Sequence, residues 1–136
     1  MAMHHKDAVT TEKAPGAIGP YSQGIKCGNM VFTSGQLPID PDSKKIPDDV
    51  QDQARIALGN VMGVLQAAGA TLSDVVKVTV FLLNIDDFAA VNEVYKELFD
   101  DERALPYPAR SAVQVAKLPG PAGCKLEIEA IAALGA

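Results

Sequence analysis

The chain has 136 residues and a formal net charge of −5, with 48% hydrophobic and 21% charged residues. This length suits one globular domain with its own core, and the composition excludes an intrinsically disordered chain. An acidic protein repels phosphate backbones and anionic lipids, so the charge disfavours nucleic acids and membrane surfaces as partners.

The N-terminal residues carry both histidines of the chain, His4 and His5. We expect residues 1–6 to form a flexible tail and residues 7–136 to form a single domain. The tail lacks the apolar stretch of a secretory signal, and no apolar run reaches the roughly 18 residues of a membrane span. Cys27 and Cys124 lie far apart and outside any CxxC pair, so two free thiols are favoured over one disulfide. These features predict a cytoplasmic protein.

The first half of the domain predicts a hairpin and a helix. Residues 22–34 contain two β-type segments around Gly28 and Asn29, a pair typical of tight turns. Residues 38–49 form a polar, proline-rich loop. Residues 48–68 then predict an amphipathic helix, because apolar residues recur at spacings of three and four.

Two glycines, Gly59 and Gly63, lie four residues apart on one side of this helix. Each destabilises a helix by about 1 kcal/mol relative to alanine. We interpret them as positions that let the helix lie close to a sheet.

The second half predicts a strand, a helix and two more strands. Residues 75–83 are largely apolar on both faces, with Val76, Val78, Val80 and Leu82 facing one way. Residues 86–99 predict a helix with the apolar stripe Phe88, Val91, Tyr95 and Leu98, which Asn92 borders. A strand begins at Arg110 within residues 108–119, and the last strand covers residues 125–132.

This element order predicts an α+β fold, in which a mixed sheet carries two helices. Two helices can cover only one face of the sheet, while the strand at 75–83 is apolar on both faces. The uncovered face therefore predicts a homo-oligomer in which copies of the chain cover it.

The residue inventory restricts the chemistry. A serine or cysteine nucleophile needs a positioned histidine, and a zinc site needs clustered cysteines and histidines; neither is present in the predicted fold. The sequence also lacks nucleotide-binding glycine motifs. The predicted fold therefore has no metal site and no cofactor.

Three charged residues stand out on the predicted strands. Arg110 follows Pro106 and Pro108, and its guanidinium suits bidentate binding of a carboxylate. That carboxylate could belong to Glu127 or to a ligand, and a plain surface arginine is the alternative. Glu127 and Glu129 alternate with core residues, a pattern that a solvated strand face would also give.

Five segments of the chain resemble the RidA family of reactive intermediate deaminases, also called the YjgF or L-PSP group. They are APGAIGPYSQGI (14–25), VFTSGQLP (31–38), VNEVY (91–95), PARSAVQVAKLP (108–119) and LEIEAIA (126–132). The resemblance implies a chorismate-mutase-like fold, with two helices on one face of the sheet, and a homotrimer with ligand sites between subunits. It also implies hydrolysis of 2-imino and 2-enamino acids to 2-keto acids and ammonia, without a metal.

The resemblance implies a role for each matching residue. Arg110 binds the substrate carboxylate, and Glu127 positions or activates the water. The other implied site residues are Tyr21, Ser34, Gly35, Asn92 and Ala112. Several family members have cysteine at the position of Ala112. If that position acts through its backbone carbonyl, activity is retained; if a thiol is needed for a redox switch, this chain lacks it.

Two further functions are known in the family or suit the same trimer. One is an endoribonuclease that inhibits translation, which the absence of a positioned histidine and the acidic charge disfavour. The other is non-enzymatic: a holdase chaperone or a protein that binds small acids.

Overall fold

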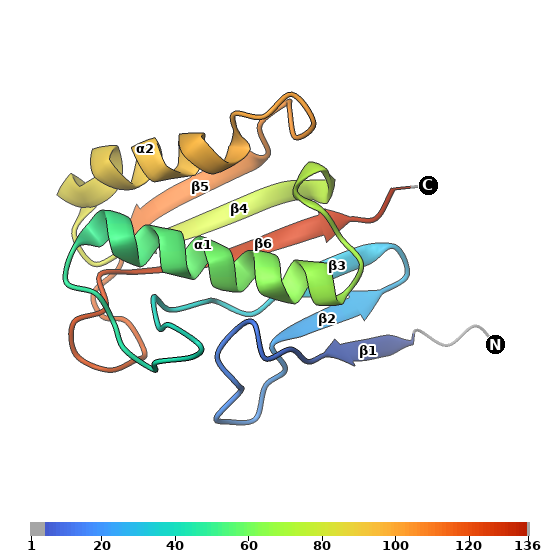
Figure 1. Cartoon of the computed structure of the whole chain (residues 1–136), viewed down its shortest axis with the longest axis horizontal. Coiled ribbons are helices and arrows are strands. Elements are labelled where there is room, and N and C mark those ends of the chain that lie inside the picture. Colours follow the sequence, from blue (N-terminus) through green and yellow to red (C-terminus); the bar gives the residue numbers. More distant parts are fainter. Residues whose placement is uncertain (1–4, 136) are drawn as a thin grey trace.

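The computed structural model describes residues 5–135, and it consists of two helices lying against one face of a six-stranded sheet (Figure 1). The strands are β1 (Lys6–Val9), β2 (Gly24–Cys27), β3 (Met30–Thr33), β4 (Val75–Leu82), β5 (Ala109–Gln114) and β6 (Leu126–Ala133), and the helices are α1 (Val50–Ala67) and α2 (Phe88–Phe99). The strand order is β1-β2-β3-β6-β4-β5, and only the β4–β5 pair is parallel. This arrangement confirms the predicted α+β fold with a mixed sheet.

The N-terminus differs from its prediction. Lys6 begins β1 and pairs with Cys27 of β2, so the last residue of the expected tail belongs to the sheet. Residues 1–4 of that tail lie outside the described residues. β1 was not predicted, because four residues with only one buried side chain give no clear alternating pattern.

The core lies between the sheet and the helices. Leu126 and Ile128 of β6, together with Val78, Val80 and Leu82 of β4, point into it and are at most 2% exposed. The predicted facing of Val76 was wrong: Val76 is 44% exposed, whereas its neighbour Val75 is buried. The reason is a register shift between Val75 and Lys77, which reverses the faces to which the side chains at the start of β4 point.

The helix glycines do not serve the contact that we expected. A Cβ on Gly63 would lie 2.8 Å from the carbonyl oxygen of Lys13, and a Cβ on Gly59 would meet nothing within 4 Å. Gly63 therefore admits the N-terminal segment and not the sheet. The close approach of helix and sheet occurs at Gly24 of β2, where a Cβ would lie 2.6 Å from a methyl carbon of Val64.

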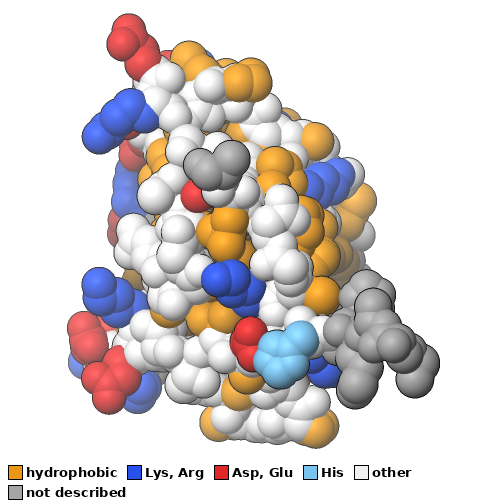
Figure 2. All heavy atoms as spheres, turned by 90° about the vertical axis from the view of Figure 1, so that its right-hand side faces the viewer, with side chains coloured by type: hydrophobic (Ala, Val, Ile, Leu, Met, Phe, Trp, Pro, Cys, Tyr) orange, Lys and Arg blue, Asp and Glu red, His pale blue; other side chains and the backbone are white. Residues whose placement is uncertain are grey.

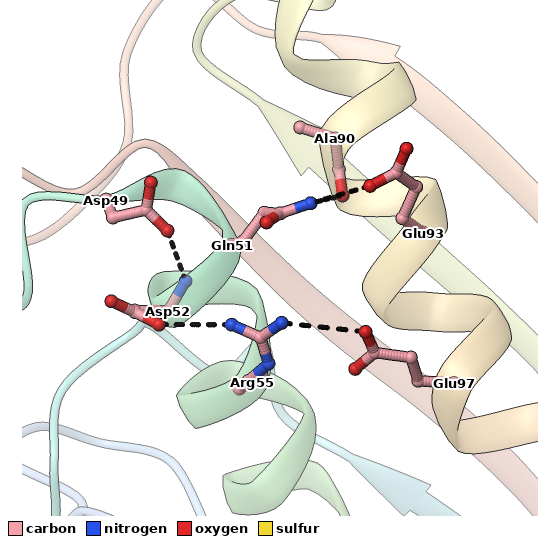
Figure 3. A network of polar contacts seen from close by, with 7 residues as sticks. All are labelled: Asp49, Gln51, Asp52, Arg55, Ala90, Glu93 and Glu97. Atoms are coloured by element: carbon pink, nitrogen blue, oxygen red, sulfur yellow. Dashed lines mark hydrogen bonds and ion pairs between the residues drawn. The ribbon is translucent and has the colours of Figure 1, made fainter.

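Polar contacts connect α1 to α2 across their outer surface (Figure 3). The side-chain amide of Gln51 donates to the carbonyl of Ala90 at 3.1 Å and to the carboxylate of Glu93 at 3.0 Å. Arg55 lies 3.6 Å from Glu97. Such exposed ion pairs contribute at most about 1 kcal/mol, but together these contacts fix where α2 lies over β5.

On the other face of the sheet, the described residues 5–135 form no helix. Phe32 of β3 and Val113 of β5 lie on this face and are 41% and 44% exposed. Hydrophobic side chains also reach the surface on the adjoining side of the molecule, which is at the right in Figure 1 and faces the viewer in Figure 2. Among residues 5–135, no helix is both long enough and apolar enough to cross a bilayer.

Candidate functional site

Arg110 lies on β5 beneath helix α2. Its partner across the sheet is Val78, whose side chain is buried under the helices, so the Arg110 side chain points to the same face. There its Nη1 donates a hydrogen bond to Oδ1 of Asn92 at 2.7 Å. The structure thus brings two of the predicted site residues into contact.

Two aromatic rings of α2 also contact this guanidinium. The Arg110 Cζ lies 5.1 Å from the ring centroid of Phe88 and 4.5 Å from that of Tyr95. Both distances are within the range of cation–π attraction. Phe88, Asn92 and Tyr95 are spaced by four and three residues, so they share one face of the helix. The prediction placed both rings in the core stripe; their spacing from Asn92 was the available sign of a link to the site.

A cavity of about 350 Å³ opens beside the guanidinium. It is lined by Asn92, Tyr95, Lys96, Tyr107, Pro108 and Arg110. A small carboxylic acid fits a space of this size, and two cationic side chains border it. Lys96 and Tyr107 were not predicted as site residues.

The Tyr95 hydroxyl is buried and has no hydrogen-bond partner among residues 5–135. Burial raises the pKa of Tyr95 to about 12, although the charge of Arg110 acts in the opposite direction. The ring therefore stays neutral at physiological pH, and its contact with Arg110 is a cation–π contact and not an ion pair.

Ser34, Gly35 and Glu127 form a second group. A Cβ on Gly35 would lie 2.5 Å from a carboxylate oxygen of Glu127, so only glycine leaves that side chain in place. The Ser34 hydroxyl donates to the carbonyl of Ser22 at 2.6 Å. This bond ties the strand end to the loop that carries Tyr21.

The loop of Tyr21 is fastened by a buried amide. Gln23 donates to the carbonyls of Thr11, Ala14 and Pro15 and accepts from the Thr11 amide at 2.8 Å. Tyr21 itself is 50% exposed, and it lines a cavity that neither Ser34 nor Glu127 borders. Within one chain, Tyr21 is therefore joined to the second group through its neighbour Ser22, and its side chain borders a different cavity.

The Glu127 carboxylate is half-buried on β6. Burial raises its pKa above the usual glutamate value, and the negative charge of Glu129 raises it further. A glutamate with a raised pKa is a better proton acceptor than an ordinary one.

The two groups lie on opposite faces of the sheet. Glu127 alternates with the buried Leu126 and Ile128, so it points away from the helices, whereas Arg110 points toward them. Phe81 of β4 pairs with both Glu127 and Val113, which places Glu127 level with a residue three positions beyond Arg110. The separation is about 10 Å along the strands and about 10 Å across them. Of the two carboxylate partners considered for Arg110, Glu127 of the same chain is thus too far away, and the Arg110 side chain is bonded to Asn92 instead.

Ala112 follows on the same face as Arg110. It is level with Val80 on the neighbouring strand, and its side chain is half-buried against the core. Any polar contact from this position must come from its backbone. Within residues 5–135, no group of three or more His, Cys, Asp or Glu side chains is arranged to hold a metal ion.

Comparison with known proteins places these features in context. Residues 11–134 match the endoribonuclease L-PSP family. The protein named 2-iminobutanoate/2-iminopropanoate deaminase of Escherichia coli K12 is 50% identical over 124 residues, which cover 91% of this chain and 94% of that protein. The crystal structure of E. coli TdcF with bound serine has a TM-score of 0.88 and 54% identity, covering 95% of this chain and 99% of that one.

Proposed function

The chain belongs to the endoribonuclease L-PSP family, which includes deaminases of the RidA type, and on this premise we propose that it hydrolyses 2-imino and 2-enamino acids to 2-keto acids and ammonia. The observation that carries the proposal is the Arg110 guanidinium, which is fixed beside a cavity of small-acid size. The named deaminase at 50% identity supports the reaction type.

The reaction needs few groups. Arg110 holds the substrate carboxylate with charge-assisted hydrogen bonds. Water adds to C2 of the protonated imine, and Glu127 accepts the proton that the water loses. Glu127 returns that proton to the nitrogen of the carbinolamine, and the C–N bond breaks as ammonia leaves. The hydroxyl oxygen forms the C2 carbonyl and gives its proton to the Glu127 carboxylate, which releases it to solvent, so the 2-keto acid remains. Because the imine carbon is already electrophilic, positioning and one proton acceptor suffice.

We place the complete site between subunits of a homotrimer. Arg110 and Asn92 come from one subunit, and Tyr21, Ser34, Gly35 and Glu127 come from its neighbour. The position of the two groups on opposite faces of the sheet supports this division. The apolar, helix-free face supports self-association, and the free thiols of Cys27 and Cys124 suit a reducing cytoplasm.

The decisive experiment measures products. Purified protein is added to a freshly generated 2-imino acid, and ammonia and 2-keto acid are quantified against the spontaneous rate. Acceleration supports the deaminase, and a rate equal to the spontaneous one refutes it. RNA cleavage is tested in parallel; among residues 5–135 the one histidine is His5, whose side chain is 85% exposed, so no positioned acid–base pair supports that alternative.

The rate of imine hydrolysis should depend on pH through the carboxylates of Glu127 and Glu129 on β6. Activity falls as the pH drops through the raised pKa of Glu127, because the protonated acid cannot accept a proton. Glu129→Gln removes a neighbouring negative charge, so the pKa of Glu127 falls and the acid limb of kcat/KM moves to lower pH. Rates measured from about pH 4 to pH 8 test this. The control Glu93→Gln, on the helix layer, should leave the limb in place.

Chelation should have no effect on the rate. Water is activated by a carboxylate in the proposed mechanism, so no divalent ion takes part. We expect equal imine hydrolysis before and after dialysis against EDTA. A loss of activity that zinc or magnesium restores would contradict the mechanism.

A further inference from the structure

The Arg110 side chain is held in place before any ligand binds. An arginine side chain loses rotamer entropy when it is fixed, and a ligand that must fix it binds more weakly. Here Asn92 fixes Nη1 at 2.7 Å, and the rings of Phe88 and Tyr95 contact the guanidinium at 5.1 and 4.5 Å. Within residues 5–135, Nε and Nη2 of Arg110 donate to no acceptor, so their edge is left for an incoming carboxylate.

Helix α2 supplies all three contacts from one face. Phe88 is half-buried and Tyr95 is 4% exposed, so the two rings shield the guanidinium from water on the side of the helix. Partial desolvation strengthens cation–π attraction. The Tyr95 ring is itself fixed, since it packs against the tilted ring of Phe99 with a centroid distance of 4.6 Å.

We propose that Phe88 and Tyr95 are positioning residues for the substrate carboxylate, which act through their rings on the Arg110 guanidinium. The proposal rests on the function proposed above and assigns the rings, not the Tyr95 hydroxyl, to the task. Because the carboxylate is bound equally in the ground state and in the transition state, loss of a ring should raise KM and leave kcat nearly unchanged.

The test compares variants that remove a ring with variants that keep it. Phe88→Leu removes a ring from a half-buried position, and it should weaken pyruvate binding and raise KM for the imino acid by about threefold to thirtyfold. Phe88→Tyr and Tyr95→Phe keep the rings and should remain within about twofold of the unmodified protein. Calorimetric titration with pyruvate measures binding without turnover, and melting temperatures report any general loss of structure.

The outcomes separate this proposal from the proposed function. If Phe88→Leu binds pyruvate as tightly as the unmodified protein, the rings have no positioning role even if deamination occurs. If Tyr95→Phe weakens binding as much as Phe88→Leu does, the hydroxyl is responsible and the proposal is overturned. Ring-dependent pyruvate binding without ammonia release would support the positioning role and refute the deaminase.

Discussion

Arg110→Ala is expected to impair imine hydrolysis severely and to leave a folded, assembled protein. A charge-assisted hydrogen bond contributes about 1.5–3 kcal/mol, so loss of a bidentate pair should lower kcat/KM by a hundredfold or more. Arg110→Lys keeps the charge but lacks the planar fork, and it should also be severely impaired. A guanidinium keeps its charge throughout the physiological range, so binding by the unmodified protein should not weaken as the pH rises through neutrality.

The structure indicates why the fold should tolerate this change. Arg110 is half-buried at the edge strand of the sheet, and its one side-chain hydrogen bond to the described part of the chain is to Asn92. It has no ion pair with Glu127 whose loss would leave a carboxylate buried without a partner. Melting temperature, oligomer mass and imine hydrolysis are measured on the same variant. Normal turnover by a stable Arg110→Ala oligomer would refute the assignment, and dissociation of the oligomer would assign the arginine to assembly.

The elements with strong local signals could be predicted from the sequence. The hairpin around Gly28 and Asn29, the helix within 48–68 and the strand at Arg110 follow from turn chemistry, apolar spacing and alternation. The parallel pairing of that strand with β4 was not predicted. The register shift at Val75 could not be predicted, because it depends on the pairing of β4 with β6. The role of Gly63 likewise depends on where the segment near Lys13 crosses the helix.

The candidate site was likewise predicted only in part. The identities of its residues came from the resemblance to a family, residue by residue. Their arrangement did not, since the period-2 alternation of a single strand does not tell which face meets the helices. Only the sheet order shows that Arg110 and Glu127 point in opposite directions. The contact of Phe88 and Tyr95 with Arg110 was not predicted, because their spacing on the helix is also that of ordinary core residues.

Mixed oligomers of two inactive variants should regain activity. Glu127→Gln keeps the shape of the side chain beside Gly35 but removes the proton acceptor, and loss of a general base lowers rates by about 10² to 10⁴. Arg110→Ala fails for a different reason, the loss of carboxylate binding. Each variant alone has no intact site, whether the site lies within one chain or between two.

Mixing distinguishes these arrangements. If Arg110 of one subunit faces Glu127 of its neighbour, random assembly from equal amounts leaves both residues intact at about a quarter of the interfaces, so about a quarter of full activity should return. If both residues of a site came from one chain, every site would keep its defect and no activity would return. The two variants are unfolded together, refolded and assayed, and native mass spectrometry establishes that mixed oligomers formed. Preparations of each variant refolded alone serve as controls. Mixed oligomers without recovered activity would refute the site between subunits, because a quarter of their interfaces would combine an intact Arg110 with an intact Glu127 and still be inactive.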